Sequence, residues 1–435
     1  DGSFEMNSDP KLALITQMIG NTTRMILLQR VLASSIADTV TVRRSYARIG
    51  GGVAKDVSTR WKSIMGGLDP KTQRLLAGAA ETSNAYNVGV LAQRASGNGT
   101  LAKMANMTTS GSNATMKWTG LNAWTRHNKG VAYVLGSSTL ARLRGTAFND
   151  LDTSVKSMLV RGNITEADWG KLNKMDNAVY AEGSDHLLDL ETIAKTDREL
   201  SEKLHASIFG FTNDAVPTPG VRERAILTQG TEAGTIVGSM MRLMTSLMGY
   251  PISYMTRQMA REMEVGGAKG MVGQTKLLAT SIFAGYISVM ANDLAQGKVR
   301  DYTSDDLDKQ GGLLIEAVAR GGGGGFAGGL LLNMMMYGGA AEGTLSGAPA
   351  SVIDRVVDGL FQTGKSAVKG DFSKAGGQGI KLVRDTLPFM SMPQTKMLFD
   401  YLAYNPLMEW VAPSTLRKAE AKWRRKTDGK LLLEK

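Results

Sequence analysis

Apolar residues recur at helical spacing along most of this 435-residue chain. Two stripes with spacings of mainly three, four or seven residues lie within Leu14–Ile36 and Leu190–Ile208. This periodicity places apolar side chains on one face of a helix, whereas a half-buried strand needs strict alternation, which is scarce in this chain. Thr165, followed by acidic residues, and Thr303–Lys309 have the composition of helix starts. The sequence therefore predicts an all-α fold without a substantial sheet.

Glycine-rich breaks divide the predicted helices. They fall at Gly50–Gly52, Ser96–Gly99, Val216–Gly220, Gly321–Gly325 and Gly376–Gly377, where helices are expected to end. We therefore expect an elongated multi-helix assembly with Gly-rich breaks. Four regions are predicted: a basic helical region at 1–150, an acidic helical region at 151–220, an apolar helical region with a hairpin and a Gly/Met segment at 221–345, and C-terminal helices with a basic tail at 346–435.

The net charge of +11 is unevenly distributed. Asn21–Arg144 contains 17 Lys and Arg against 4 Asp and Glu, whereas Gly145–Gly220 contains 7 against 13. Two basic regions flanking an acidic one favour contacts with a polyanion or between copies of the chain. An ordinary solvated basic surface explains the charge equally well. Arg43 and Arg44 are the candidate contacts to DNA or lipid phosphate in the first basic region.

Two uncharged apolar segments flank a charged turn. Leu277–Asn292 and Gly321–Ala341 are separated by Gly297–Lys309, which predicts a helical hairpin. The first segment is slightly short of a membrane span, and the second is rich in Gly. Such runs in soluble proteins usually lie in a core. Small residues four apart also suit close helix packing in a membrane, although a flexible hinge fits the same composition. The candidate membrane or close-packing residues are Gly321, Gly324, Gly325, Gly328, Gly329, Leu331 and Met335.

One stretch matches the phosphate-binding pattern G-x-x-x-x-G-K-[ST]. Gly359–Ser366 has the required residues, but this loop needs a buried strand before it and a helix after it. The preceding Ser351–Leu360 has helical spacing, and no alternation of strands and helices follows. A nucleotide-hydrolysing protein is therefore a remote alternative.

Residues that support catalysis or metal binding are few. The chain has no Cys and three His, which are far apart in sequence. Disulfides and thiolate chemistry are therefore excluded. Neither a Ser/His/Asp set nor a pair of acid/base carboxylates is recognisable by spacing. We expect no enzymatic activity, no cofactor and no metal site.

The C-terminal Ser414–Lys430 combines 7 basic with 2 acidic residues on a predicted helix. Leu416, Ala419 and Trp423 form its packing stripe, so the basic side chains face solvent, phosphate or anionic lipid. A plain solvated basic helix is the alternative. The candidate phosphate contacts here are Arg417, Lys418, Lys422, Arg424, Arg425 and Lys426.

The order of the C-terminal features resembles a known family. The apolar Met241–Met263 leads into Leu277–Asn292 and the Gly/Met segment. The ending, Thr386–Lys430, combines a Leu-Pro-x-x-x-x-Pro break, a Phe-Asp helix, a Pro turn and the basic helix. Over about Met241–Lys430 the chain is similar to the C-terminal part of the large internal virion, or DNA-ejection, proteins of short-tailed bacteriophages. Nothing matches the lytic transglycosylase domain of the longest members.

This resemblance implies a structural role. Such proteins form an oligomeric core near the portal inside the capsid, and they enter the host before the genome to help form a conduit across the periplasm and inner membrane. The implied partners are further copies of the chain, other internal virion proteins, the portal, viral DNA through non-specific phosphate contacts, and the host inner membrane. We expect the chain to be a piece of a longer protein. A capsid-internal DNA-organising protein without membrane activity is the alternative.

Overall fold

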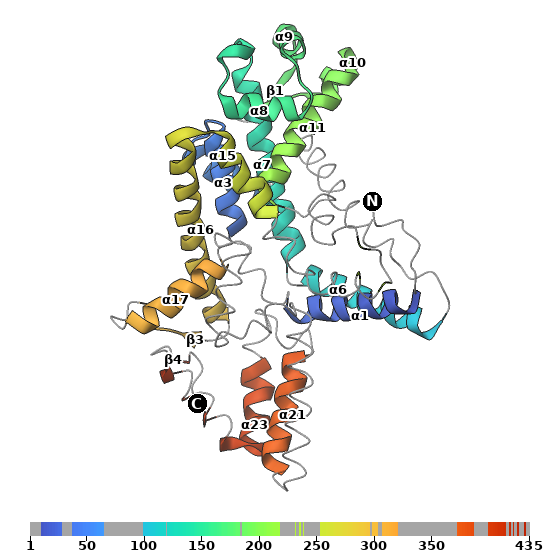
Figure 1. The fold of residues 1–435 in the computed structure, drawn as a ribbon, viewed down its shortest axis with the longest axis vertical. Helices are drawn as coiled ribbons and strands as arrows, with labels where there is room; N and C mark the ends of the chain where they lie inside the picture. Colours follow the sequence, from blue (N-terminus) through green and yellow to red (C-terminus); the bar gives the residue numbers. More distant parts are fainter. Residues whose placement is uncertain are drawn as a thin grey trace.

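The computed structural model describes about three fifths of the chain, and its described residues are mainly helical (Figure 1). The described residues are 10–27, 37–64, 99–118, 120–182, 185–217, 253–295, 298–302, 307–320, 372–386, 399–414 and single positions at 231, 235, 238, 417, 418, 421, 424, 425, 430 and 431. Within them, strands form only two antiparallel pairs, each of two strands. The predicted all-α fold is confirmed, while the elongated form remains a prediction.

One apolar core joins helices from the first half of the chain. The long helix α7 (Leu121–Leu143) packs against α11 (Arg198–Ala215), and both contact α3 (Ala37–Arg48). Helix α4 (Val53–Ile64) lies against α7 as well. Figure 1 shows α7 and α11 side by side, with α3 next to them. The buried cluster includes residues from both sides of position 150, where the charge pattern changes sign.

Short elements close one end of this core. They are η2 (Phe148–Asp150), α8 (Thr153–Arg161), α9 (Glu166–Lys174) and the hairpin of β1 (Val179–Glu182) and β2 (Asp185–Leu188). The predicted helix start at Thr165 is confirmed. Its hydroxyl accepts a hydrogen bond from the Asp168 backbone N–H, and the Asp168 carboxylate accepts one from the Thr165 N–H, which satisfies two donors at the helix end.

The apolar stripe of Leu190–Ile208 belongs to two helices rather than one. Helix α10 (Leu190–Thr196) ends where α11 begins. Asp197 lies between them in an extended conformation, and its carboxylate accepts a hydrogen bond from the Leu200 N–H at 3.0 Å. An N-cap aspartate of this kind starts a new helix. Both helices bury their parts of the stripe in the same core, so the apolar spacing continues across the break.

A separate helix pair contains the first predicted stripe. Helix α1 (Pro10–Leu27) packs against α6 (Thr100–Trp118). The Gln17 Nε2 atom donates to the Thr109 hydroxyl at 3.0 Å. The predicted helix is confirmed as far as Leu27, and 28–36 lie outside the described residues.

The apolar segment Leu277–Asn292 lies inside α16 (Gly267–Ala295), the longest described helix. It follows η3 (Tyr254–Met259) and α15 (Ala260–Glu264). Gly266 and Gly267, with φ of 70° and 54°, turn the chain from α15 into α16, a conformation that favours glycine.

A helical hairpin is present at this point of the chain. Helix α16 packs against α17 (Leu307–Arg320), and α17 begins within the predicted helix start Thr303–Lys309. Among the described residues, α17 is therefore the helix that follows the turn and packs on α16. The predicted second arm, Gly321–Ala341, lies outside the described residues.

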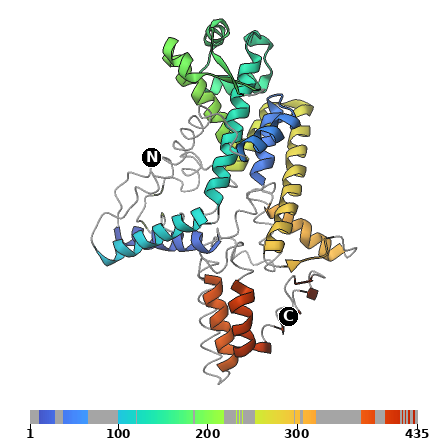
Figure 2. The same ribbon diagram turned by 180° about the vertical axis from the view of Figure 1, so that it is seen from behind.

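The described C-terminal helices pair with each other. Figures 1 and 2 show α21 (Phe372–Thr386) beside α23 (Asn405–Val411), which follows η5 (Asp400–Tyr404). Arg384 of α21 forms an ion pair with Asp400 at 2.5 Å and stacks over the Tyr404 ring at 4.2 Å. The short β3 (Lys298–Val299) pairs with β4 (Lys430–Leu431), so the end of the chain returns to the turn between α16 and α17.

Candidate functional site

A buried carboxylate fastens α15 to α3. Glu262 is 1% exposed, and its Oε1 and Oε2 atoms accept hydrogen bonds from Arg44 Nε at 2.9 Å and Nη2 at 2.7 Å. Arg48 Nη1 lies 3.5 Å from Oε1. Burial is the main factor that lowers the pKa of Arg48, and Glu262 acts in the opposite direction. Two guanidinium groups therefore share one carboxylate, which leaves the triad with a net positive charge.

A second ionic cluster continues from this triad to α8 and α11. The Asp214 carboxylate lies 2.9 Å from Arg261 Nε and 3.5 Å from Arg161 Nη2. Glu264 pairs with the same two arginines. Burial tends to raise the pKa of Glu264, but the two guanidinium charges hold it below its ordinary value. Ionic contacts thus join four helices from distant parts of the sequence.

A π-helix supplies the polar link between the two clusters. The amide of Gln258 in η3 is fully buried and donates to the Ser45 hydroxyl at 2.9 Å and to the Ala215 carbonyl at 3.3 Å. The Asp214 carbonyl is a third acceptor that shares the two N–H hydrogens of this amide. These carbonyls belong to the last turn of α11, where a helix has no internal donors for them. Isolated π-turns of this kind are frequent at functional sites.

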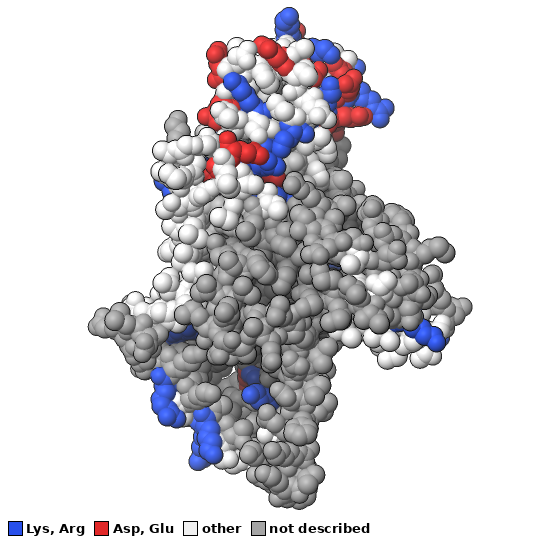
Figure 3. All heavy atoms as spheres, viewed as in Figure 1, with Lys and Arg blue, Asp and Glu red and all other residues white. Residues whose placement is uncertain are grey.

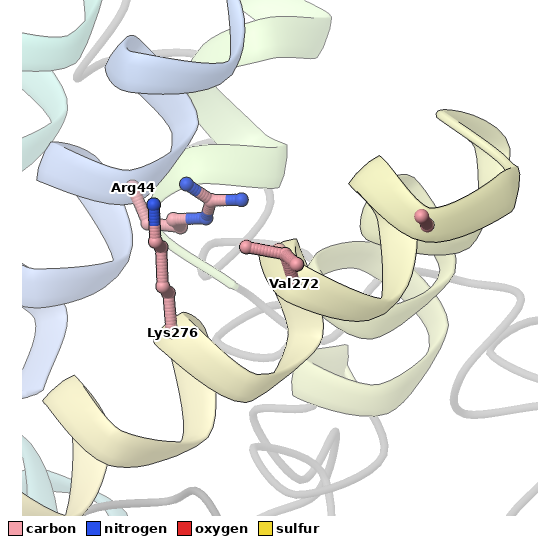
Figure 4. Close-up of a pocket in the computed structure, with 5 residues that line it drawn as sticks. Arg44, Val272 and Lys276 are labelled. Atoms are coloured by element: carbon pink, nitrogen blue, oxygen red, sulfur yellow. The ribbon is translucent and has the colours of Figure 1, made fainter.

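A pocket of about 350 Å³ opens beside the Glu262 triad (Figure 4). Its lining residues are Arg44, Ala268, Val272, Gly273 and Lys276. Figure 4 shows Lys276 extending from α16 towards Arg44 of α3, with Val272 also directed towards the guanidinium. Gly273 allows this close approach, because a Cβ there would lie 2.6 Å from Arg44 Nη2.

Helix α16 also exposes a stripe of large apolar side chains. Phe283, Ile287, Met290 and Leu294 are exposed and spaced by four, three and four residues, so they lie on one helix face. Phe283 is 64% exposed. We refer to these four residues as the α16 stripe. In the described part of the chain, no helix combines the length and hydropathy required to span a bilayer.

The structure gives both predicted arginines of the first basic region a partner within the chain. Arg44 is held by Glu262, and Arg43 Nη1 donates to the Gly51 carbonyl at 3.3 Å. The Arg44 side chain nevertheless also lines the pocket. The other predicted phosphate contacts are not brought near these two, since Arg417, Lys418, Arg424 and Arg425 lie exposed near the C-terminus. Lys422, Lys426 and the seven candidate close-packing residues lie outside the described side chains, as does Gly359–Ser366.

The surface charge can be compared with the predicted regions only where side chains are described. Figure 3 shows acidic and basic side chains intermixed over the end of the molecule that contains α8 to α11. Near the C-terminus, the visible charged atoms of the described residues are mainly basic. Among the described residues, no three His, Asp or Glu side chains are grouped as metal ligands.

Sequence reasoning missed Glu262, Asp214 and Lys276. The only local signal was the acidic pair within Ala260–Glu264, next to an arginine. The functional geometry depends on contacts between residues about two hundred positions apart, such as Arg44 and Glu262. Comparison of the chain with protein-family models, with curated proteins and with solved structures finds no match in any of the three.

Proposed function

We propose that the chain is a structural internal virion protein of a bacteriophage. In this proposal it forms part of an oligomeric core at the portal, and after ejection it contributes to a conduit for the genome across the host envelope. The resemblance of Thr386–Lys430 to the ejection proteins motivates the proposal. The structural observation that supports it is the α16 stripe, which presents apolar side chains outward.

The α16 stripe has the character of a contact surface. Single exposed apolar residues are normal, but a contiguous apolar face marks an interaction site or a membrane-facing surface. Its helix is anchored on the opposite side, where Leu277, Ala284 and Val289 are buried. A surface of this kind suits a protein that packs against other copies in the capsid and meets the inner membrane after ejection.

The proposal is tested by the oligomeric state of the purified chain. Phe283→Asp places a charge on the most exposed residue of the α16 stripe, so light scattering should show a shift from oligomer to monomer. Val160→Asp is the matched control, since Val160 is 60% exposed on α8, away from the stripe. A monomeric wild-type chain, or an oligomer unchanged by Phe283→Asp, contradicts the assembly part of the proposal.

The membrane part has its own assay. Dye release from vesicles of phosphatidylglycerol should occur with the wild-type chain and fall with Phe283→Asp. Replacement of Gly324 and Gly328 with Ile tests the contribution of the Gly/Met segment. Absence of release from the wild-type chain would favour the capsid-internal alternative.

The second candidate function is organisation of DNA inside the capsid without membrane activity. The exposed side chains of Arg417, Lys418, Arg424 and Arg425 favour it. Non-specific binding to DNA weakens linearly with the logarithm of salt concentration, with a slope of about −0.9 for each phosphate neutralised. Replacing Arg417 and Lys418 with Gln should therefore reduce the slope by about two, and the wild-type chain should release no dye from vesicles.

Nucleotide hydrolysis is the remote alternative. It depends only on the sequence match at Gly359–Ser366. ATP turnover that disappears in Lys365→Ala would support it, and no turnover by the wild-type chain would exclude it.

A further inference from the structure

The pocket beside Glu262 presents two cationic groups to solvent. Arg44 uses Nε and Nη2 to bind Glu262, and its Nη1 has no hydrogen-bond partner among the described residues. Lys276 is exposed, and its Nζ has neither an ion pair nor a hydrogen bond within the described part of the chain. Both side chains line the same pocket. Lys276 and Val272 are four residues apart, so α16 presents them on one face.

The charge balance of the pocket favours an anion. Glu262 is the only carboxylate in contact with Arg44 among the described residues, and it is shared with Arg48. Two guanidinium charges on one carboxylate leave one positive charge, and Lys276 adds a second at the mouth. The five lining residues include no acidic side chain. An incoming anion therefore meets a positive potential without displacing Glu262.

The shape and donor arrangement select a phosphate group. A carboxylate is satisfied by the paired N–H groups of one guanidinium, as Glu262 shows. A tetrahedral phosphate has more oxygens, and it can accept from Arg44 Nη1 and from the mobile ammonium of Lys276 together. The pocket volume of about 350 Å³ lies in the range of small-ligand sites.

We propose that this pocket binds a phosphate ester through Arg44 and Lys276, with Val272 and Ala268 as its apolar wall. The ligand is a free phosphate ester or the headgroup of an anionic phospholipid, which share this chemistry. The site does not depend on the proposed role in genome delivery, because its lining residues belong to α3 and α16 and Glu262 of α15 holds Arg44 in place.

The test is calorimetric titration of the purified chain with inorganic phosphate and with glycerol 3-phosphate, at constant ionic strength in chloride. One saturable site per chain is expected. Lys276→Gln removes an exposed charge and should raise the dissociation constant about tenfold, as expected from loss of one charge-assisted hydrogen bond. Val272→Glu places a carboxylate in the lining and should weaken binding at least as much.

Two matched controls separate the site from general charge effects. Met271→Glu introduces the same charge one residue away, at an exposed position outside the lining. Lys103→Gln removes an exposed lysine from α6. Both should retain binding within twofold of the wild type, and circular dichroism should show the same helical content in all variants.

Vesicles distinguish the two sources of phosphate. Binding to phosphatidylglycerol vesicles, but not to phosphatidylcholine vesicles, with loss in Lys276→Gln and Val272→Glu, identifies a lipid headgroup. Binding of glycerol 3-phosphate without binding to the vesicles identifies a free phosphate ester. The proposal is overturned if the wild-type chain binds neither soluble phosphate compound saturably and also fails to bind phosphatidylglycerol vesicles, or if Lys276→Gln and Val272→Glu bind as the wild type does.

Discussion

Replacement of Glu262 with Gln tests the junction that holds α15 on α3. The variant keeps the size of the side chain and one acceptor oxygen, but it leaves Arg44 and Arg48 without their shared negative charge. Removing one partner of a buried ion pair costs about 3–5 kcal/mol, because the remaining charge is left uncompensated. Arg44 is 21% exposed at its side chain and can recover some hydration, whereas Arg48 is 6% exposed. We therefore expect a loss of about 3 kcal/mol, at the lower end of that range.

Thermal unfolding followed by circular dichroism measures this loss. For a cooperative unit of about 150–250 residues, about 3 kcal/mol corresponds to a decrease in Tm of about 6–12 °C. Glu264→Gln is the matched control on the same helix, since Glu264 is 42% exposed, and it should cost less than about 1 kcal/mol. Adding Arg48→Met to Glu262→Gln should restore part of the stability, because it removes the buried unpaired charge. Equal Tm values for Glu262→Gln and Glu264→Gln would refute this reasoning.

Three further predictions concern stability. Gly273→Ala should destabilise the chain by about 1–3 kcal/mol, because its Cβ would meet the Glu262 carboxylate and the Arg44 guanidinium. At Gly311 an added Cβ meets no atom within 4 Å. Gly311→Ala should therefore stabilise α17 by about 0.5–1 kcal/mol in denaturant unfolding. Burial lowers the pKa of Lys129 to about 8. Above about pH 8 the unfolded chain therefore binds more protons than the folded chain does. The free energy of unfolding of the wild type, relative to that of Lys129→Met, should rise by about 1–2 kcal/mol between about pH 7.5 and 9.5. A difference between the two free energies of unfolding that stays constant over this pH range would contradict the prediction. Thr165→Ala removes the cap of α9 and should cost about 1 kcal/mol in urea unfolding, whereas Thr165→Ser should cost little.

The sequence was sufficient for the helices because their signals are local. Apolar spacing predicted α1 and α11, and Thr165 predicted the start of α9. The break at Asp197 was missed because the apolar spacing continues through it, although an aspartate three residues before a buried leucine is an N-cap signal.

The candidate site could be predicted only in part. The first basic region identified Arg44, but Glu262, its partner, is 218 positions away. Such pairs depend on the packing of α15 and α16 around Gly266 and Gly267, which spacing along the chain does not determine. The prediction of an exposed basic C-terminus needs no tertiary contact, and Arg417 and Lys418 are indeed exposed.

The location of the chain in the phage particle tests the proposed function most directly. Electron cryomicroscopy of particles that carry the chain, reconstructed without imposed symmetry and with the chain labelled, measures this location. The proposal predicts density for several copies inside the head, on the portal, and loss of that density in particles that have released their DNA. A chain located outside the head, or absent from purified particles, would contradict it.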